Sequence, residues 1–278
     1  MRLGISFTLP HATPEEWAAK NRALGLGAVV FPVDHTAGDE TVAAYLETAE
    51  KYDLKIAEVG AWKNLLAPDP AEKAKNYAYV LGQCKLAEKV GAACCVDISG
   101  ACGEVWDGGY PGNYSKETFY EVVATAKRLI AEAGMKKSAF TLEPMPWMLP
   151  WDAESYLELI DAVGSENFAV HMDAINLMNS PDRYFHCADF LKHTFSLLSG
   201  RIRSVHVKDV ALQRTLTLHL KEVPIGEGGF DIPTYARLAE NESADIPFII
   251  EHLGKEEEYL KAIEAVKGIL EKEGIKLK

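Results

Sequence analysis

The sequence has few cysteines, no long apolar run and no excess of positive charge. Its 278 residues include five cysteines, an odd number without the paired spacing of a zinc ribbon, so a disulfide-stapled fold is disfavoured. No segment approaches the roughly 18 consecutive apolar residues that a membrane-spanning helix needs. The opening residues also lack the apolar stretch of a secretory signal peptide. We therefore expect a cytoplasmic protein whose thiols are free and mostly buried.

The sequence has fewer positively charged residues than negatively charged ones, 29 lysines and arginines against 41 aspartates and glutamates. The formal net charge is −12, which opposes binding to the phosphates of nucleic acids or to anionic membranes. Hydrophobic residues make up 48% of the chain and charged residues 25%, the composition of a folded globular protein rather than a disordered one. We expect neither a nucleic-acid partner nor a membrane partner.

A glycine-rich phosphate-binding turn is also missing. The first apolar run leads into Thr8-Leu9-Pro10-His11, whereas a dinucleotide-binding open sheet carries a G-x-G-x-x-G turn at this place. This absence weighs against a doubly wound open sheet.

What the sequence does contain is a regular alternation of short apolar runs and helical patterns. Between the runs, apolar residues recur at three-to-four spacing, as in 119–133 before Gly134, which is typical of an amphipathic helix with a glycine stop. No linker interrupts the pattern, so residues 1–278 are predicted to form one domain, an α/β protein with a single (β/α)8 TIM barrel. The eight runs are Leu3–Phe7, Ala28–Val33, Lys55–Val59, Ala92–Ile98, Ala139–Glu143, Phe168–Asp173, Ile202–Val207 and Pro247–Glu251.

Four successive predicted strands end in side chains that can bind a metal. These side chains are Glu143, Asp173, His206 and Glu251. A single acid at a strand end is as often a helix cap or a loop acceptor, but four in succession are hard to explain in that way. In a barrel the carboxyl ends of the strands form the active site, and three carboxylates at a dry rim repel one another unless a cation lies between them. The pattern predicts one divalent metal ion, Mn²⁺ first, with Mg²⁺, Co²⁺ and Zn²⁺ as alternatives.

Further polar and aromatic residues lie at or after the same strand ends. Each has a structural alternative, such as a salt bridge for Lys208, a satisfied core position for His171 and loop packing for Trp147. His252 follows Glu251 directly and is predicted to point away from the site. The candidates for substrate binding are Asp97, Trp147, His171, Asn176 and Lys208.

One candidate lies in the long segment that follows the seventh predicted strand. His219 is a candidate general acid or base, if this segment folds over the metal. The alternative is a loop residue that only makes hydrogen bonds.

At these positions the sequence resembles the xylose isomerase-like TIM-barrel superfamily, the sugar phosphate isomerases and epimerases grouped with AP-endonuclease-type barrels. The resemblance covers nearly the whole chain and is carried by Leu142-Glu143-Pro144, His171-Met172-Asp173, His206-Val207-Lys208-Asp209 and Ile250-Glu251-His252. It implies that the four strand-end residues bind one divalent metal. It also implies that Glu143 and Glu251 face each other across a sugar, one removing a proton beside a carbonyl to give an enediolate and the other returning a proton.

The sequence departs from the familiar ketose epimerases at two positions. Asn176 stands where they usually have a histidine, and the nearest arginine after His206 is Arg214, further along than usual. The segments 143–147, 179–181 and 216–223 look closer to a branch whose catalytic subunits cleave C-glycosides of 3-keto sugars by β-elimination.

Two functions therefore stay open, a metal-dependent sugar isomerase or epimerase and a metal-dependent lyase acting on 3-keto-glycosides. An AP endonuclease and a non-catalytic sugar-binding barrel are weaker alternatives. We expect a small sugar or glycoside as substrate and a homo-oligomer as the assembly. The lyase alternative would add a small partner subunit that completes the site.

Overall fold

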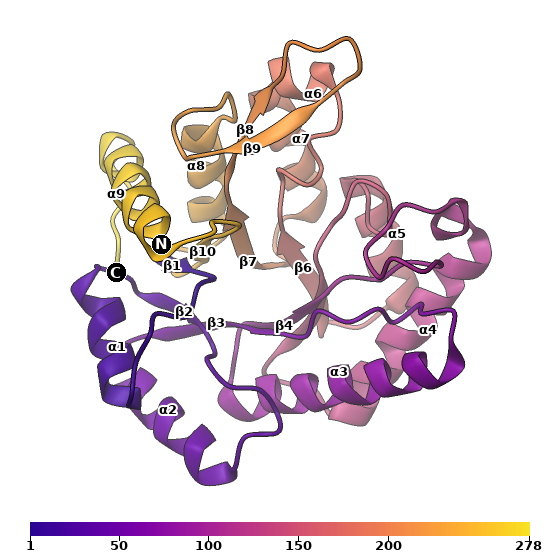
Figure 1. Ribbon diagram of the computed structural model, residues 1–278, viewed down its shortest axis with the longest axis horizontal. Helices are drawn as coiled ribbons and strands as arrows, with labels where there is room; N and C mark the ends of the chain where they lie inside the picture. The colour runs from indigo at the N-terminus through magenta and orange to yellow at the C-terminus, as the bar shows by residue number, and fades with distance from the viewer.

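Eight parallel strands form the central sheet, in the order β1-β10-β7-β6-β5-β4-β3-β2. The computed structural model describes residues 1–278, and helices surround the strands (Figure 1). This is the (β/α)8 barrel that the sequence predicts. The strands are β1 (Arg2–Ile5), β2 (Ala28–Val30), β3 (Lys55–Gly60), β4 (Cys94–Asp97), β5 (Ala139–Leu142), β6 (Phe168–Met172), β7 (Ile202–Val207) and β10 (Pro247–Ile250).

All eight predicted runs form strands of this sheet, and their ends differ from the predicted ends by at most three residues. The prediction succeeds because the strands are covered on both sides. Every residue of β4, β5 and β6 is buried, which matches nearly continuous apolar runs rather than alternating ones.

The outer layer consists of helices that begin and end where the sequence supplies caps. The longest helix, α3, follows Asp69, whose carboxylate accepts the amides of Ala71 and Glu72, and it ends at Gly91 with φ of 65°. Side-chain acceptors and left-handed glycines satisfy backbone groups that a helix end leaves free. The helices are α1 (Pro14–Ala23), α2 (Asp39–Lys51), α3 (Pro70–Val90), the 3₁₀ turn η1 (Pro111–Tyr114), α4 (Lys116–Ala133), α5 (Ala153–Val163), α6 (Pro181–Phe185), α7 (Cys187–Leu198), α8 (Ile232–Glu242) and α9 (Glu256–Lys272).

The barrel has one seam, between β1 and β2. The ladder of paired strands starts at β1, passes through β10 and ends at β2, and across the remaining gap the Gly27 amide donates to the Leu3 carbonyl at 2.9 Å. The two strands approach closely because Gly4 has no side chain: a Cβ there would lie 2.6 Å from the Ala28 carbonyl oxygen.

The segment after β7 is not a simple loop. It forms an antiparallel hairpin of β8 (Asp209–Leu212) and β9 (Leu220–Val223), which projects from the barrel in Figure 1. The buried Asp209 carboxylate fixes its base by accepting the amides of Val210, Gly226, Gly228 and Phe230. The sequence analysis missed this hairpin because its strands are short and partly exposed.

The cysteines are all free, and four of the five are buried, as expected from their spacing. None of the helices combines the length and apolar content that crossing a bilayer requires.

Candidate metal centre and active site

Four side chains from neighbouring strands converge at the carboxyl end of the barrel. Glu143 follows β5, Asp173 follows β6, His206 lies near the end of β7 and Glu251 follows β10. Each offers one ligand atom, and these four atoms all lie within 4.8 Å of one another. All four side chains are buried. The structure thus brings together the full set of residues that the sequence predicts as metal ligands.

The two-residue period of the strands explains the convergence. Alternate residues such as Leu142, Met172 and Val205 pack into the main apolar core of the molecule, so the residues between them face the barrel interior. The inward residues are Thr141 and Glu143 at β5, His171 and Asp173 at β6, and Ser204, His206 and Lys208 at β7.

Two buried polar atoms in the cluster lack a hydrogen bond. His206 Nδ1 and Asp173 Oδ2 are buried and complete no hydrogen bond. Each has a charged neighbour: His206 Nδ1 is 2.9 Å from Glu251 Oε2, and Asp173 Oδ2 is 2.7 Å from Lys208 Nζ. The angles of these two contacts are unsuitable for a hydrogen bond. Buried lone pairs of this kind, on a set of carboxylates and one imidazole, fit a divalent cation.

Lys208 lies inside this cluster rather than at its rim. Its Nζ is 2.6 Å from Glu251 Oε1 as well as 2.7 Å from Asp173. Burial alone would lower the pKa of Lys208, but the Asp173 and Glu251 carboxylates outweigh burial and hold that pKa well above its usual value. Lys208 is therefore an ammonium in a buried ion-pair network. This agrees with the salt bridge that the sequence left open as its structural role. Substrate binding by Lys208 stays a prediction.

The surroundings of the two glutamates of the cluster shift their pKa values in opposite directions. Burial, reinforced by the charge of Glu251, holds the pKa of Glu143 well above its usual value. Burial would also raise the pKa of Glu251, but the charges of His206 and Lys208 outweigh it and keep that pKa well below its usual value. Asn176 Nδ2 donates to Glu143 Oε1 at 2.8 Å, which places Asn176 in the site.

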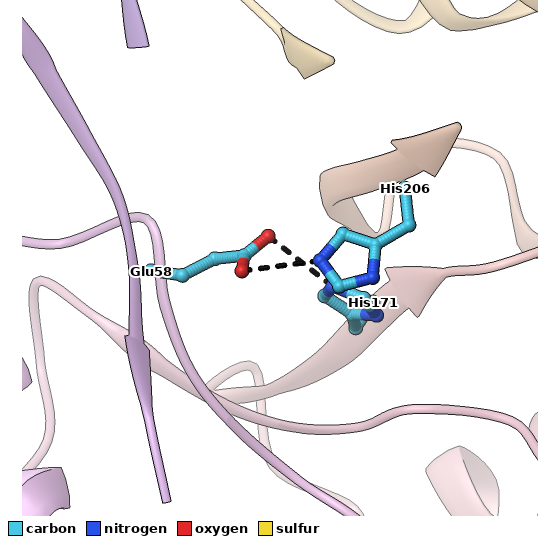
Figure 2. Close-up of side chains that lie close together, drawn as sticks. All are labelled: Glu58, His171 and His206. Atoms are coloured by element: carbon cyan, nitrogen blue, oxygen red, sulfur yellow. Dashed lines mark hydrogen bonds and ion pairs between the residues drawn. The ribbon is translucent and has the colours of Figure 1, made fainter. Parts of the chain in front are cut away.

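A second polar layer lies deeper in the barrel, and the sequence analysis missed its central residue. The carboxylate of Glu58 on β3 is 3.2 Å from both His171 Nε2 and His206 Nε2, and it accepts a hydrogen bond from Ser204 Oγ (Figure 2). Burial would raise the pKa of Glu58, but the charges of His206 and His171 outweigh it and bring that pKa well below its usual value.

A β-bulge brings Glu58 into the barrel. Val29 pairs with Ile56, but the next residue, Val30, pairs with Glu58, so Ala57 is an extra residue on β3. Ala57 packs inside the barrel with Ala28 and Ile249, and Glu58 also reaches the interior. Consecutive inward residues are a hallmark of a bulge. An acidic residue within an otherwise buried strand was the available signal, because such a charge requires partners.

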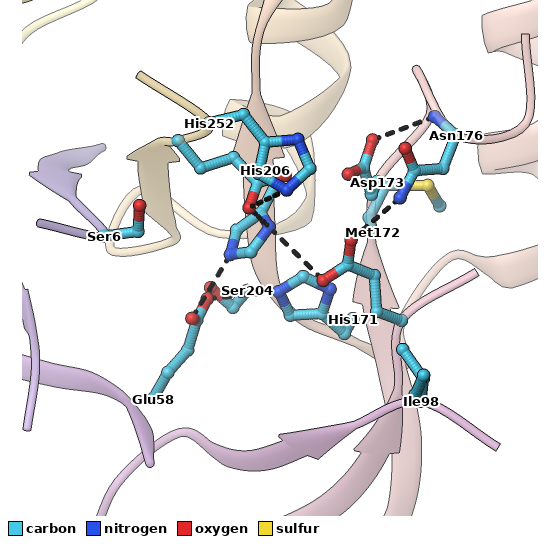
Figure 3. A network of polar contacts seen from close by, with 12 residues as sticks. Ser6, Glu58, Ile98, His171, Met172, Asp173, Asn176, Ser204, His206 and His252 are labelled. Carbon is cyan, nitrogen blue, oxygen red and sulfur yellow. Dashed lines mark hydrogen bonds and ion pairs between the residues drawn. The ribbon is translucent and has the colours of Figure 1, made fainter. Parts of the chain in front are cut away.

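His171 belongs to this deeper layer. It is fully buried, and burial together with the charge of His206 lowers its pKa. Figure 3 shows Glu58 and His171 on one side of His206, with Asp173 and Asn176 on another. The structure places His171 as a core histidine bonded to Glu58, and contact with substrate stays a prediction for it.

His252 does not point away from the site, so that prediction is wrong. Its Nδ1 lies 3.0 Å from Glu222 Oε1 and 3.1 Å from Lys208 Nζ. The cause is the backbone of His252, whose φ of 59° turns the chain out of the strand's alternation. The hydrogen bond to Glu222 raises the pKa of His252.

A cavity of about 430 Å³ opens beside this contact. Lys208, Glu222, Glu251 and His252 contribute to its wall, so the cavity runs from the ion-pair network to solvent. Its other lining residues are Val223, Pro224, Ile225, Glu227, Leu253, Glu258, Lys261 and Ala262.

Three predicted site residues lie outside the cluster's contacts. The Asp97 carboxylate accepts the amides of Lys63 and Ile98 at 2.8 and 2.9 Å, and burial raises its pKa to about 8. Trp147 is 41% exposed, and its Nε1 donates to the Asp107 carbonyl. His219 is exposed between β8 and β9. The substrate-binding roles of Asp97 and Trp147 and the acid–base role of His219 stay predictions.

Comparison with known proteins finds one family model and several solved structures that match this barrel. The family model described as "Xylose isomerase-like TIM barrel" matches residues 18–269. A D-psicose 3-epimerase from Clostridium cellulolyticum H10, solved with D-tagatose, is 15% identical, with a TM-score of 0.68 over 97% of this chain and 98% of the other. Among curated protein sequences, none matches this chain.

Two further solved structures are similar to the same extent. A 3-keto-D-glucoside 4-epimerase from E. coli is 11% identical, with a TM-score of 0.70 over 97% of this chain and 98% of the other. A xylose isomerase-like TIM barrel protein from Mycobacterium smegmatis in complex with magnesium is 17% identical, with a TM-score of 0.68 over 94% and 89%. At these identities the likeness establishes a shared fold.

Proposed function

We propose, from the premise that this chain belongs to the xylose isomerase-like TIM barrel family, that it is a divalent-metal-dependent sugar isomerase or epimerase. It would move a proton on the carbon next to a sugar carbonyl. The observation that carries this proposal is the convergence of Glu143 and Glu251 with Asp173 and His206 within 4.8 Å. Such a set combines a cation site with two carboxyl groups suited to proton transfer.

The chain's own residues account for the proton movement. Glu143 and Glu251 would share this work: one removes the proton next to the carbonyl, and the other returns a proton to the substrate. Glu143, Asp173, His206 and Glu251 would hold the metal, with Mn²⁺ first and Mg²⁺, Co²⁺ or Zn²⁺ as alternatives. When bound there, a divalent ion would stabilise the negative charge that develops on the substrate oxygens.

The cavity next to the cluster favours an uncharged substrate. Four carboxylates line it against two lysines and one histidine, so a phosphate or carboxylate group would meet repulsion there. A volume of about 430 Å³ lies within the range of small-ligand sites, roughly 300–1,000 Å³. We propose a neutral sugar or glycoside as substrate, and a homo-oligomer as the working assembly.

The second candidate is a lyase that eliminates the aglycone from a 3-keto-glycoside, with a small partner subunit. The paired His252 and Glu222 favour it, because they add a proton donor near Lys208 and Glu251, and elimination needs an acid for the leaving group. Both candidates share the removal of a proton next to a carbonyl. The similar structure of a 3-keto-D-glucoside 4-epimerase supports both candidates, because that protein is an epimerase and its substrate is a 3-keto-glucoside.

The deciding experiment is incubation of the metal-loaded protein in D₂O with ketoses and 3-keto-glycosides, followed by mass spectrometry. Deuterium in an otherwise intact sugar supports the isomerase or epimerase. Release of the aglycone supports the lyase. The chelator-treated protein is the control. If neither product forms with Mn²⁺, Mg²⁺, Co²⁺ or Zn²⁺, both proposals are wrong for these substrates.

A further inference from the structure

The buried carboxylate of Glu58 has no part in the chemistry proposed above, and it is only 2% exposed. Its two oxygens meet three polar groups: His171 Nε2 and Ser204 Oγ at Oε1, and His206 Nε2 at Oε2. No lysine or arginine contacts it. A carboxylate so far from water persists only where its partners are fixed.

Only one of these partners also reaches the metal-ligand cluster. The imidazole of His206 has Nε2 3.2 Å from Glu58 and Nδ1 2.9 Å from Glu251. In a neutral imidazole one nitrogen carries the proton and the other a lone pair. Carboxylates lie against both nitrogens of His206, Glu58 at Nε2 and Glu251 at Nδ1. A divalent ion at the cluster would take the lone pair of Nδ1, and the remaining proton would then stay on Nε2, where Glu58 accepts it.

We propose that Glu58 is a positioning residue, which holds His206 as its Nε2–H tautomer and so presents Nδ1 to the divalent ion. The inference rests on the proposed function, since it needs an ion at the cluster of Glu143, Asp173 and Glu251. Carboxylates behind metal-binding histidines commonly have this role.

The packing of His171 strengthens the arrangement. Its ring meets the ring of His206 edge-on, with centroids 4.1 Å apart and an interplanar angle of 89°. Because His171 also contacts Glu58, rotation of the His206 ring would break the contact between the two rings and the bond to Glu58. The His206 side chain is thus held both in its rotamer and in its tautomer.

Glu58, His171 and His206 also lie close enough to hold an ion themselves. The hydrogen bonds favour the supporting role, because both carboxylate oxygens already accept from protein donors. An ion at this place would have to displace the Ser204 hydroxyl and the two imidazole N–H groups. The proposal therefore requires one ion per chain.

The first test is the affinity for Mn²⁺ and Co²⁺, measured by calorimetric titration, together with the visible absorption spectrum of the Co²⁺ protein. Glu58→Gln should weaken binding about 10- to 100-fold, the range found for such supporting residues, and should alter the Co²⁺ spectrum. Thr141→Val is the matched control, because Thr141 is a buried inward residue that bonds only the Cys95 carbonyl. The affinity of Thr141→Val for Mn²⁺ and Co²⁺ should stay within about twofold of that of the original protein. An unchanged affinity in Glu58→Gln overturns the proposal.

The second test needs no variant, so it stands even if Glu58→Gln does not fold. Nitrogen-15 NMR of the Zn²⁺-loaded protein, with labelled histidine, should show His206 with its proton on Nε2 and the metal on Nδ1. The opposite tautomer, or two ions per chain in the titration, overturns the assignment. A protein that binds no divalent ion would instead refute the proposed function itself.

Discussion

At the scale of single residues, the most consequential side chain is Lys208. It brings a permanent positive charge between Asp173 and Glu251, at 2.7 and 2.6 Å. Two buried carboxylates without a cation would be costly to fold. We therefore expect the barrel to fold without a metal, because the lysine compensates these carboxylates.

Replacing this lysine should make the fold depend on metal. In Lys208→Met we expect the free energy of unfolding, measured with chelator present, to fall by about 3–5 kcal/mol, because one partner of a buried pair is removed. Added Mn²⁺ should then raise the Tm of the variant more than that of the original protein. Lys192→Met, at an exposed lysine, is the control. Equal Mn²⁺-induced shifts in the two proteins would contradict the compensating role.

Glu143 should matter for rate beyond its contribution to metal binding. At saturating Mn²⁺, Glu143→Gln should slow deuterium exchange into the substrate by about 10²- to 10⁴-fold, since an amide can neither accept nor deliver the proton. Measuring exchange across a range of Mn²⁺ concentrations separates this effect from weaker binding. Full exchange at saturating metal would remove Glu143 from the proton-transfer step.

At the scale of elements, the sequence predicts what depends on periodicity and misses what depends on backbone exceptions. The strand-end ligands follow from the two-residue alternation, so Glu143, Asp173 and Glu251 could be found without a structure. Glu58 depends on a bulge at Ala57, and His252 depends on a positive φ. Tertiary packing selects both backbone conformations, so the alternation of residues predicts neither of them; only the acidic Glu58 within an apolar run hinted at a buried polar layer.

The hairpin β8–β9 also escaped the sequence analysis, although it brings Glu222 to the site. We expect Glu222→Gln to lower kcat/KM about tenfold, because the hydrogen-bonded carboxylate beside His252 is lost. The control is Thr217→Ala in the exposed turn of the same hairpin, which should leave kcat/KM nearly unchanged. Steady-state kinetics on the substrate identified in D₂O provides the measurement. Similar losses in both variants would point to the hairpin as a whole rather than to Glu222.

At the scale of the whole molecule, an ion-pair cluster joins distant parts of the chain. Asp245, just before β10, accepts from Arg2 Nε at 2.7 Å and Lys55 Nζ at 3.2 Å, and Lys278 Nζ lies 3.4 Å away. These partners come from β1, β3 and the last residue of the chain. Burial would raise the pKa of Asp245, but the hydrogen bonds from Arg2 and Lys55 outweigh it and hold that pKa well below its usual range.

This cluster should give the fold a measurable pH dependence. Because the folded pKa of Asp245 lies below the unfolded value of about 3.9, its contribution is present above that pH and is lost as the pH falls toward the folded pKa. Asp245→Asn should cost about 1–2 kcal/mol at pH 7, a figure reduced for partial exposure, and the difference should shrink below about pH 4. Denaturant unfolding across pH, with Glu264→Gln in an exposed pair as control, tests this. A constant difference at all pH values would contradict it.

The seam between β1 and β2 has a consequence for how the molecule opens. In an edge strand with few backbone hydrogen bonds, small local fluctuations are enough for the amide hydrogens to exchange. In strands paired on both sides, the amides exchange only when larger parts of the fold open. The strands that carry the four ligands, β5, β6, β7 and β10, are consecutive neighbours in the sheet, whereas β2 ends the ladder at the seam and pairs only with β3. Amide deuterium uptake should therefore begin at β2 while the ligand strands stay protected. We therefore expect the barrel to loosen first along its seam, with the strands that carry the metal ligands still paired.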